Sequence, residues 1–409
     1  MTRRSKRVTK AKLKRKIDYH LRKLGFRRHR NGNFVLRSSE KQIVRTLHAQ
    51  QRLERLKSNK AFIKANTPNL IKHFASGTDI VPSEIRPVLQ RVYSGTWESE
   101  LFRLASLSWS VPVSSGFGRR LRYLVWDDSN GKLIGLLAIG DPVFNLSVRD
   151  QYISWNADDR GKRLVNILDA YVLGALPPYN TLLCGKLVAC LLKTRELYKD
   201  FKNEYGGTRG IISGKKKEAR LLAITTTSSM GRSSVYNRLK INDVEYLKPL
   251  GYTGGWGHFH IPENIFEDMR TYLRISRHPY ADLHKFGDGP NWRLRTARAA
   301  LDGLGFKADM LKHGIGREVF IAELASNAKK ILSTGKGKPN TSKLRSVEDV
   351  SAQAIHRWVI PRSLSRMEYL VWTPEQFKYL LSENINIASM LTPRELVDEH
   401  GRQQPATFT

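Results

Sequence analysis

Cysteine is scarce in this sequence, with two residues, Cys184 and Cys190, among 409. So few thiols exclude a disulfide framework and a zinc site built from cysteines, and they fit a reducing compartment. Long apolar runs are also lacking, because no stretch approaches the roughly 18 consecutive apolar residues that a membrane span needs. The N-terminus is basic but carries no apolar core of a secretion signal. We therefore expect a cytoplasmic protein without a membrane span.

Familiar catalytic signatures are missing too. The sequence contains no Walker loop, no zincin motif and no Ser-His-Asp order, and its carboxylates show no two-metal spacing typical of a nuclease. His258 and His260 are two residues apart on one face of an expected strand, but no convincing third ligand accompanies them. We therefore predict no metal site, leave the cofactor unassigned, and interpret both histidines as structural or binding residues.

Positive charge dominates the composition. Seventy Lys and Arg against 37 Asp and Glu give a formal net charge of +33. The first 60 residues hold 21 of these cations and only three acids, Asp18, Glu40 and Glu54. A hydrophobic fraction of 40% is enough to build a core, which excludes disorder throughout the chain. A folded chain this basic favours nucleic acid, DNA above all, as its partner.

A basic amphipathic helix is predicted near the N-terminus. A threonine suited to the N-cap, apolar residues at helical spacing and a terminal glycine follow one another at Thr9, Leu13, Ile17, Leu21, Leu24 and Gly25. We predict that this module contacts phosphates through Arg3, Arg4, Lys12, Arg15, Lys16, Arg22, Lys23, Arg27 and Arg28. Two other interpretations are a solvated helix that docks on the rest of the protein and a helix on a membrane surface. The second is disfavoured because the apolar face lacks Trp and Phe.

Changes in composition divide the chain into five expected parts. These are a basic helical module (1–96), an α/β core (97–280), a basic helix-and-strand extension (281–332), a flexible Gly/Lys/Ser/Pro-rich linker (333–346) and a helical tail (347–409). Within the core and the extension we expect strands at 121–126, 133–139, 170–176, 221–227, on both sides of 254–255, and at 319–324. Helices are expected at 158–168, 181–201, 233–239 and 292–304. The expected fold class is α+β (mixed α/β), with a central sheet and flanking helices.

Polar clusters of the core are candidate sites. Asp141 and Arg149 follow a strand end, where sites often gather in open sheets, although local turn bonds are the alternative interpretation. Hydroxyl and guanidinium groups begin the expected helix at 233–239, which suits an anion, with ordinary N-capping as the alternative. The nucleic-acid surface is predicted to include Arg119, Arg120, Arg149, Lys186, Arg232, Ser233, Ser234, Arg238, Arg293 and Arg295. The catalytic residue of a core enzyme stays unassigned, with Asp141, Tyr236 and His258 as candidates and the last two suited to proton transfer.

A series of segments points to a known family. In order they are WSVPVS (109–114), GRRL (118–121), GDPVFNL (140–146), DAYVLGA (169–175), PPY (177–179), GKL (185–187), GRSSVYNRLK (231–240), GHFH (257–260), GPNW (289–292) and HGI (313–315). Together they resemble the DruA family of the Druantia anti-phage defence system, over roughly residues 10–332. The resemblance implies bacterial immunity against phage and partner proteins that include a large helicase-like component. It carries over no catalytic residue.

A second resemblance concerns the fold of the core. The expected order of strand, loop, long helix, strand and short helix is similar to the core of GNAT acyltransferases. In that family a Gln/Arg-x-x-Gly-x-Gly/Ala loop binds the pyrophosphate of acetyl-CoA through bare backbone amides. The corresponding NTLLCGK (180–186) keeps one glycine and places Leu182 and Leu183 where the backbone must approach a phosphate, although Lys186 offers a point charge.

Two functions follow as hypotheses. The first is a defence component that binds phage DNA, or its replication or repair intermediates, through a basic surface and acts with partners including a helicase. The alternative is a GNAT-like enzyme that modifies a nucleobase or an acyl acceptor. Self-association into a homo-oligomer is compatible with either hypothesis.

Overall fold

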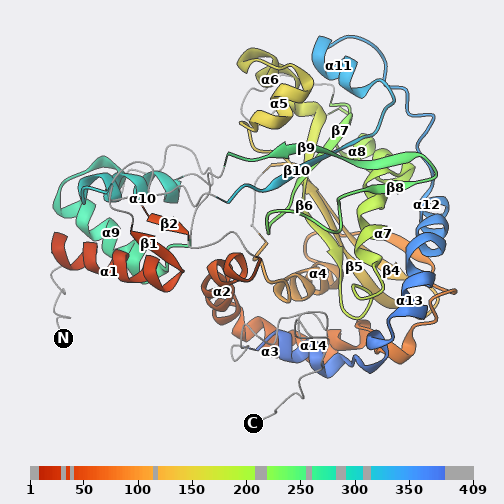
Figure 1. Ribbon diagram of the computed structural model, residues 1–409, viewed down its shortest axis with the longest axis horizontal. Helices are drawn as coiled ribbons and strands as arrows, with labels where there is room; N and C mark the ends of the chain where they lie inside the picture. Colours follow the sequence, from red (N-terminus) through yellow and green to blue (C-terminus); the bar gives the residue numbers. More distant parts are fainter. Residues whose placement is uncertain are drawn as a thin grey trace.

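A central sheet organises the molecule (Figure 1). The computed structural model describes residues 9–28, 34–36, 41–113, 118–207, 219–254, 260–281, 292–306 and 315–382. Within these residues the sheet has eight strands in the order β3 (Pro87–Arg91), β4 (Arg120–Asp127), β5 (Lys132–Gly140), β6 (Ile167–Ala175), β7 (Ala223–Thr227), β10 (Glu318–Glu323), β9 (Val244–Tyr252) and β8 (Leu239–Ile241). Neighbouring strands are antiparallel except β6 and β7, which are parallel. The predicted α+β fold class is confirmed.

The β4–β5 hairpin forms where the sequence predicts it, because its turn is fixed locally. The buried Asp127 carboxylate accepts hydrogen bonds from the backbone N–H and the hydroxyl of Ser129 and from the N–H of Arg86. Gly131 takes a φ of +67°, which a side chain would disfavour. Nearly every residue of β5 is buried, since both faces of the sheet are covered.

Helices cover the two faces of the sheet. On one face, the hydrophobic core contains α4 (Trp97–Leu107) together with residues of α2 (Lys41–Ser58), α3 (Lys60–Leu70) and α14 (Pro374–Leu380). On the other face, the core includes α7 (Cys184–Cys190), α8 (Arg195–Tyr205) and α12 (Val347–Ala354). A third cluster packs α5 (Ser147–Ile153) and α11 (Ala328–Thr334) beside β7 and β10, close to α6 (Ala157–Arg163). After α12 the chain continues through a π-helix (Ile355–Val359), α13 (Ile360–Ser365) and a 3₁₀ helix (Glu368–Val371).

A separate group of elements, which we call the basic lobe, lies at the left of Figure 1. It consists of α1 (Lys10–Lys23), β1 (Phe26–Arg28), β2 (Phe34–Leu36), α9 (Glu263–Ile275) and α10 (Trp292–Gly303). One hydrophobic cluster joins α1, α9 and α10, and it also contains Val44 and Leu47 of α2. Segments that the sequence analysis assigned to three different parts of the chain therefore share one core.

The expected long helix at 181–201 is wrong in detail. The chain forms α7, a 3₁₀ turn at Leu191–Lys193 and then α8. Thr194 interrupts the helix, because its backbone bridges to Arg345 and its hydroxyl donates to the Leu191 carbonyl at 2.8 Å. Thr181 is not the N-cap, since its hydroxyl donates to the Pro178 carbonyl at 2.6 Å.

Three further local predictions also differ from the structure. Residues 234–238 form turns rather than a helix. The helix expected at 158–168 ends at Arg163, and Ile167 already begins β6. Strand β3 was not predicted, because it lies within residues 1–96, where a helical module was expected. The strand expected after 255 falls partly on 255–259, and the end of the expected helical tail falls on 383–409. Both ranges lie outside the described residues.

The stretch expected as a flexible linker contacts the core. The Asn340 N–H donates to Asn327 Oδ1 at 3.0 Å, and the Ser326 N–H donates to the Asn340 carbonyl at 3.0 Å. Leu344 is buried in the main core. These contacts hold the segment between α11 and α12 against the sheet. Among the helices of the described residues, none has both the length and the apolar character that crossing a membrane requires.

Candidate nucleic-acid interface

Helix α1 forms as the sequence predicts. Thr9 Oγ1 accepts a hydrogen bond from the Lys12 N–H at 3.3 Å, and Gly25 follows the helix with a φ of +93°. Leu13, Ile17 and Leu21 are fully buried in the cluster shared with α9 and α10. The apolar face of α1 is thus used inside the basic lobe, and the opposite face is left to solvent.

The outer side of α1 and β1 is cationic. Six of its cations are exposed and form no ion pair in the described part of the chain. We call this set the cationic face: Lys10, Lys12, Arg15, Lys23, Arg27 and Arg28. Two other predicted phosphate contacts are paired with acids: Lys16 with Asp268 at 2.5 Å and Arg22 with Asp18 at 2.9 Å. The cationic face therefore meets solvent with its charge uncompensated.

Helix α10 carries further cations of the basic lobe. Arg293 points into the lobe, where it donates to Glu263 Oε2 at 2.7 Å and lies 4.0 Å from the centre of the Phe266 ring. Arg295 and Arg298 are exposed. Lys10 was not among the predicted contacts, although it directly follows the expected N-cap Thr9.

Three predicted site residues, Arg3, Arg4 and His258, lie outside the described residues. His260 is described, and its Nε2 lies 2.9 Å from Glu54 Oε2 while its carbonyl accepts a hydrogen bond from His20 Nε2 at 2.8 Å. Burial lowers the pKa of both histidines. His260 therefore links the basic lobe to α2. The described residues bring together no group of three or more His, Cys, Asp or Glu that suits a metal ion.

Asp141 holds the strand end in place. Arg119 Nε and Nη2 donate to Asp141 Oδ1 at 2.8 and 2.6 Å, and the Arg119 N–H donates to Oδ2 at 2.9 Å. Both oxygens are engaged, which supports the turn interpretation over a catalytic role. Gly118 allows this geometry, since a Cβ there would lie 2.2 Å from Asp141 Oδ2. The Arg120 guanidinium lies over Tyr171, 4.7 Å from the ring centre.

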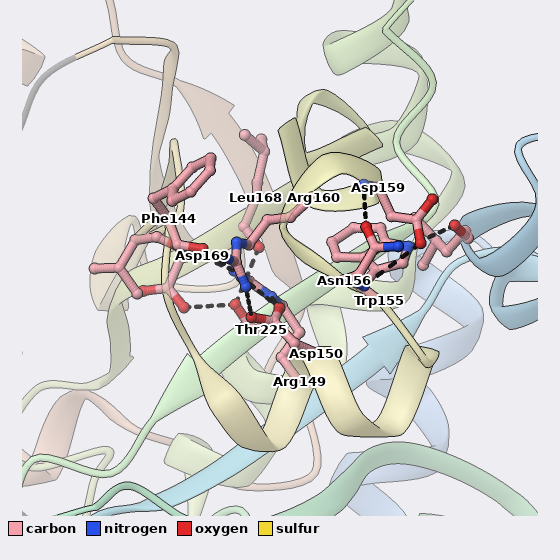
Figure 2. A network of polar contacts seen from close by, with 12 residues as sticks. Phe144, Arg149, Asp150, Trp155, Asn156, Asp159, Arg160, Leu168, Asp169 and Thr225 are labelled. Carbon is pink, nitrogen blue, oxygen red and sulfur yellow. Dashed lines mark hydrogen bonds and ion pairs between the residues drawn. The ribbon is translucent and has the colours of Figure 1, made fainter. Parts of the chain in front are cut away.

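Arg149 is the centre of a buried network (Figure 2). Its Nη1 and Nη2 donate to the carbonyls of Val143 and Phe144 at 2.9 and 2.8 Å. Nε and Nη2 also donate to Asp150 Oδ1 at 2.9 and 2.7 Å, and Asp150 Oδ2 accepts from Arg160 Nη1 at 2.7 Å. The Arg149 side chain is 0% exposed. Arg149, which the sequence analysis placed on the nucleic-acid surface, is thus buried, and its donors are used to fix the loop after β5.

Next to this network, Asp169 carries a carboxyl in an unfavourable environment (Figure 2). Burial raises its pKa to about 6, although a hydrogen bond from the Thr225 hydroxyl at 2.7 Å and the charge of Arg149 act in the opposite direction. Thr225 is opposite Asp169 in the parallel pairing of β6 and β7.

We expect Asp169→Asn to raise the free energy of unfolding at pH 7.5 by up to about 3 kcal/mol. A carboxyl whose pKa is raised by folding costs stability while it is ionised. That cost is fully present above about pH 6 and disappears as the pH falls toward the ordinary value of 3.8. Urea unfolding at pH 7.5 and pH 4 checks this, with Asp128→Asn at an exposed carboxyl as the control. An equal effect at both pH values would contradict it.

The segment at 231–240 does not form the expected anion site at a helix N-terminus. The buried Ser233 donates its N–H to Glu318 Oε2 at 3.0 Å, and its Oγ accepts from the Tyr236 N–H at 3.0 Å. The Tyr236 hydroxyl donates to the Leu173 carbonyl at 2.7 Å, and burial raises its pKa. The Tyr236 hydroxyl is therefore held as a hydrogen-bond donor to the backbone of β6. The other predicted contacts of this segment, Arg232, Ser234 and Arg238, are exposed.

Lys186 lies on α7, far along the chain from the cationic face. Its ammonium group is 5.3 Å from the centre of the Trp358 ring, and burial lowers its pKa. Leu182 is fully buried and Leu183 precedes α7 with a φ of +63°, so apolar side chains stand where a pyrophosphate needs bare amides. The structure thus brings Lys12, Arg15, Lys23, Arg27 and Arg28 together on one lobe. The core candidates lie apart from that lobe, some in structural contacts and others, such as Arg232 and Arg238, exposed.

Comparisons with known proteins identify relatives over most of the chain. Residues 38–334 match the family model described as Druantia protein DruA. A curated Druantia protein DruA from Escherichia coli (strain UMEA 4076-1) is 61% identical over 365 residues, which cover 89% of this chain and 90% of that protein. No solved structure matches.

Proposed function

This chain belongs to the Druantia protein DruA family, and from that premise we propose that it acts in anti-phage defence as a component that binds nucleic acid, in the first place DNA. The observation that carries the proposal is the cationic face of α1 and β1. The proposal includes action in the cytoplasm alongside other proteins of the defence system, a helicase-like component among them.

The electrostatics of the basic lobe support a polyanionic ligand. Four of the five acids on its described helices, Asp18, Glu263, Glu267 and Asp268, are each paired with a cation of the same lobe, and the fifth, Asp302, is exposed. Lys12 and Arg15 are three residues apart on α1, and Lys23 continues the same face toward β1. A row of unpaired cations on a protein of net charge +33 gains affinity by releasing counterions from a phosphate backbone.

We propose no second function for the core. Among the described residues, Asp141 and Tyr236 are engaged in contacts that hold strands and turns. The GNAT-like description of the core stays a prediction: β6, α7 and β7 follow in the expected order, whereas the long helix is broken and turns replace the short helix.

The test is an equilibrium titration of the full-length protein with single-stranded and double-stranded DNA at several salt concentrations. We expect the triple variant Lys12→Gln, Arg15→Gln, Lys23→Gln to bind about 10²-fold more weakly near 0.1 M salt. The slope of log affinity against log salt should fall by about 2–3, because each lost phosphate contact removes about 0.7–0.9. These side chains are exposed, so thermal unfolding should be unchanged.

A matched control separates a local site from general charge. Lys336, Lys338 and Lys343 are exposed on the segment between α11 and α12, and their replacement by glutamine removes the same three charges. This control should bind DNA almost as tightly as the unmodified protein. Equal weakening in both triple variants, or none in either, would refute the assignment to α1.

A further inference from the structure

An aromatic side chain stands in the middle of the cationic face. Tyr19 is 72% exposed, and it lies four residues after Arg15 and four before Lys23. This spacing puts the three side chains on one side of α1, with about 6 Å along the helix axis between Tyr19 and each cation. The ring is therefore flanked along the helix by two unpaired positive charges.

The fold gives no reason for a tyrosine at this position. The apolar residues of α1 that build the lobe, Leu13, Ile17 and Leu21, point to the opposite side. In the described part of the chain, Tyr19 makes no ring contact, no cation–π contact and no side-chain hydrogen bond. A large exposed ring without intramolecular contacts, inside a binding surface, is available to a ligand.

We propose that Tyr19 stacks on an unpaired base, so that the cationic face of α1 selects nucleic acid that exposes unpaired bases. The inference rests on the proposed function and specifies its substrate class. In a duplex the faces of the bases are covered by stacking, and only their edges are accessible in the grooves. A protruding ring with cations on both sides along the helix fits a single strand, whose phosphates and base faces are both accessible.

The charge of the surroundings distinguishes this ligand from a protein partner. Exposed tyrosine and arginine also occur at the centre of protein interfaces, where apolar residues usually accompany them. Around Tyr19 the exposed neighbours at helical spacing are Lys12, Arg15, Arg22 and Lys23, without an exposed aliphatic residue among them. A surface of this kind suits a polyanion with aromatic faces.

The experiment compares two substitutions in the full-length protein. Tyr19→Ala should weaken binding to a single-stranded DNA oligonucleotide by about tenfold or more and leave binding to the blunt duplex of the same sequence unchanged, because stacking contributes only where base faces are free. Tyr19→Phe should keep single-strand affinity within about twofold, since the ring is retained. A single-stranded RNA of the same sequence tests whether accessible base faces alone are sufficient for stacking. If they are, Tyr19→Ala lowers the affinity for this RNA by the same factor as the affinity for single-stranded DNA.

The salt dependence gives a second readout. Tyr19→Ala should leave the salt slope for single-stranded DNA unchanged, whereas the Lys12/Arg15/Lys23 variant lowers it. Tyr379→Ala is the matched control, because Tyr379 is an exposed helical tyrosine (48%) beside Lys378, which is paired with Glu375. It should leave all affinities unchanged.

Failure of this inference differs from failure of the proposed function. If Tyr19→Ala binds single strands normally while the triple variant is weakened, or if Tyr19→Ala weakens duplex and single strand alike, selective stacking is refuted and phosphate binding stands. If neither variant changes any affinity, the nucleic-acid function of α1 is refuted as well.

Discussion

Replacing Arg149 by alanine is expected to lower the free energy of unfolding by about 3–5 kcal/mol. The guanidinium is completely buried, and it neutralises Asp150 and satisfies the carbonyls of Val143 and Phe144. Alanine leaves two carbonyls without these donors and leaves Asp150 with Arg160 as its remaining cation. The loss is large because buried polar groups keep their desolvation cost when the partner is removed.

Urea unfolding of the purified variant measures this loss. The control is Lys162→Ala on the neighbouring α6, where both partners of the Lys162–Asp158 pair are largely exposed (66% and 72%). Surface pairs of this kind contribute about 0–1 kcal/mol, so the control should unfold almost like the unmodified protein. At a temperature where the Arg149 variant is folded, it should bind DNA normally. A stable variant with lost DNA binding would show instead that Arg149 contacts the ligand.

Arg149 also illustrates what the sequence can predict about a site. A cation that follows a strand end looks the same in sequence whether it faces solvent or the core. Its burial depends on α6 and the loop after β5 packing against α5, and those contacts are set by the tertiary structure. By contrast, the cationic face of α1 was predictable, because cap, apolar spacing and charge all lie within about four turns of one helix.

The same distinction applies to the fold. The β4–β5 hairpin and α1 were predicted correctly, since Asp127, Gly131 and Thr9 fix them through local bonds and backbone conformation. Strand β3 and the turns at 234–238 were missed because they depend on distant residues. β3 pairs with β4, and the second segment is held by Glu318 and by the Leu173 carbonyl. Local patterns carry no information on such partners.

A chain that begins at Trp97 is expected not to fold. The segment before Trp97 provides β3, at the edge of the central sheet, and the buried side chains Leu56, Leu70, Phe74 and Val92 in the cluster around α4. Burial of four such side chains contributes about 6–12 kcal/mol, which is comparable with the whole stability of a typical domain of about 5–15 kcal/mol. We expect the truncated chain to show no cooperative unfolding transition in circular dichroism.

A chain that begins at Lys41 provides the comparison, because it lacks α1 and β1 but keeps α2, α3 and β3. It should retain a cooperative transition for the sheet, although α9 and α10 lose the packing of Leu13, Ile17 and Leu21. A cooperative transition in the Trp97 chain equal to that of the full-length protein would show that the first 96 residues are an independent module. If the expectation holds, loss of DNA binding on that truncation reports unfolding, and only substitutions on the surface of α1 test the interface.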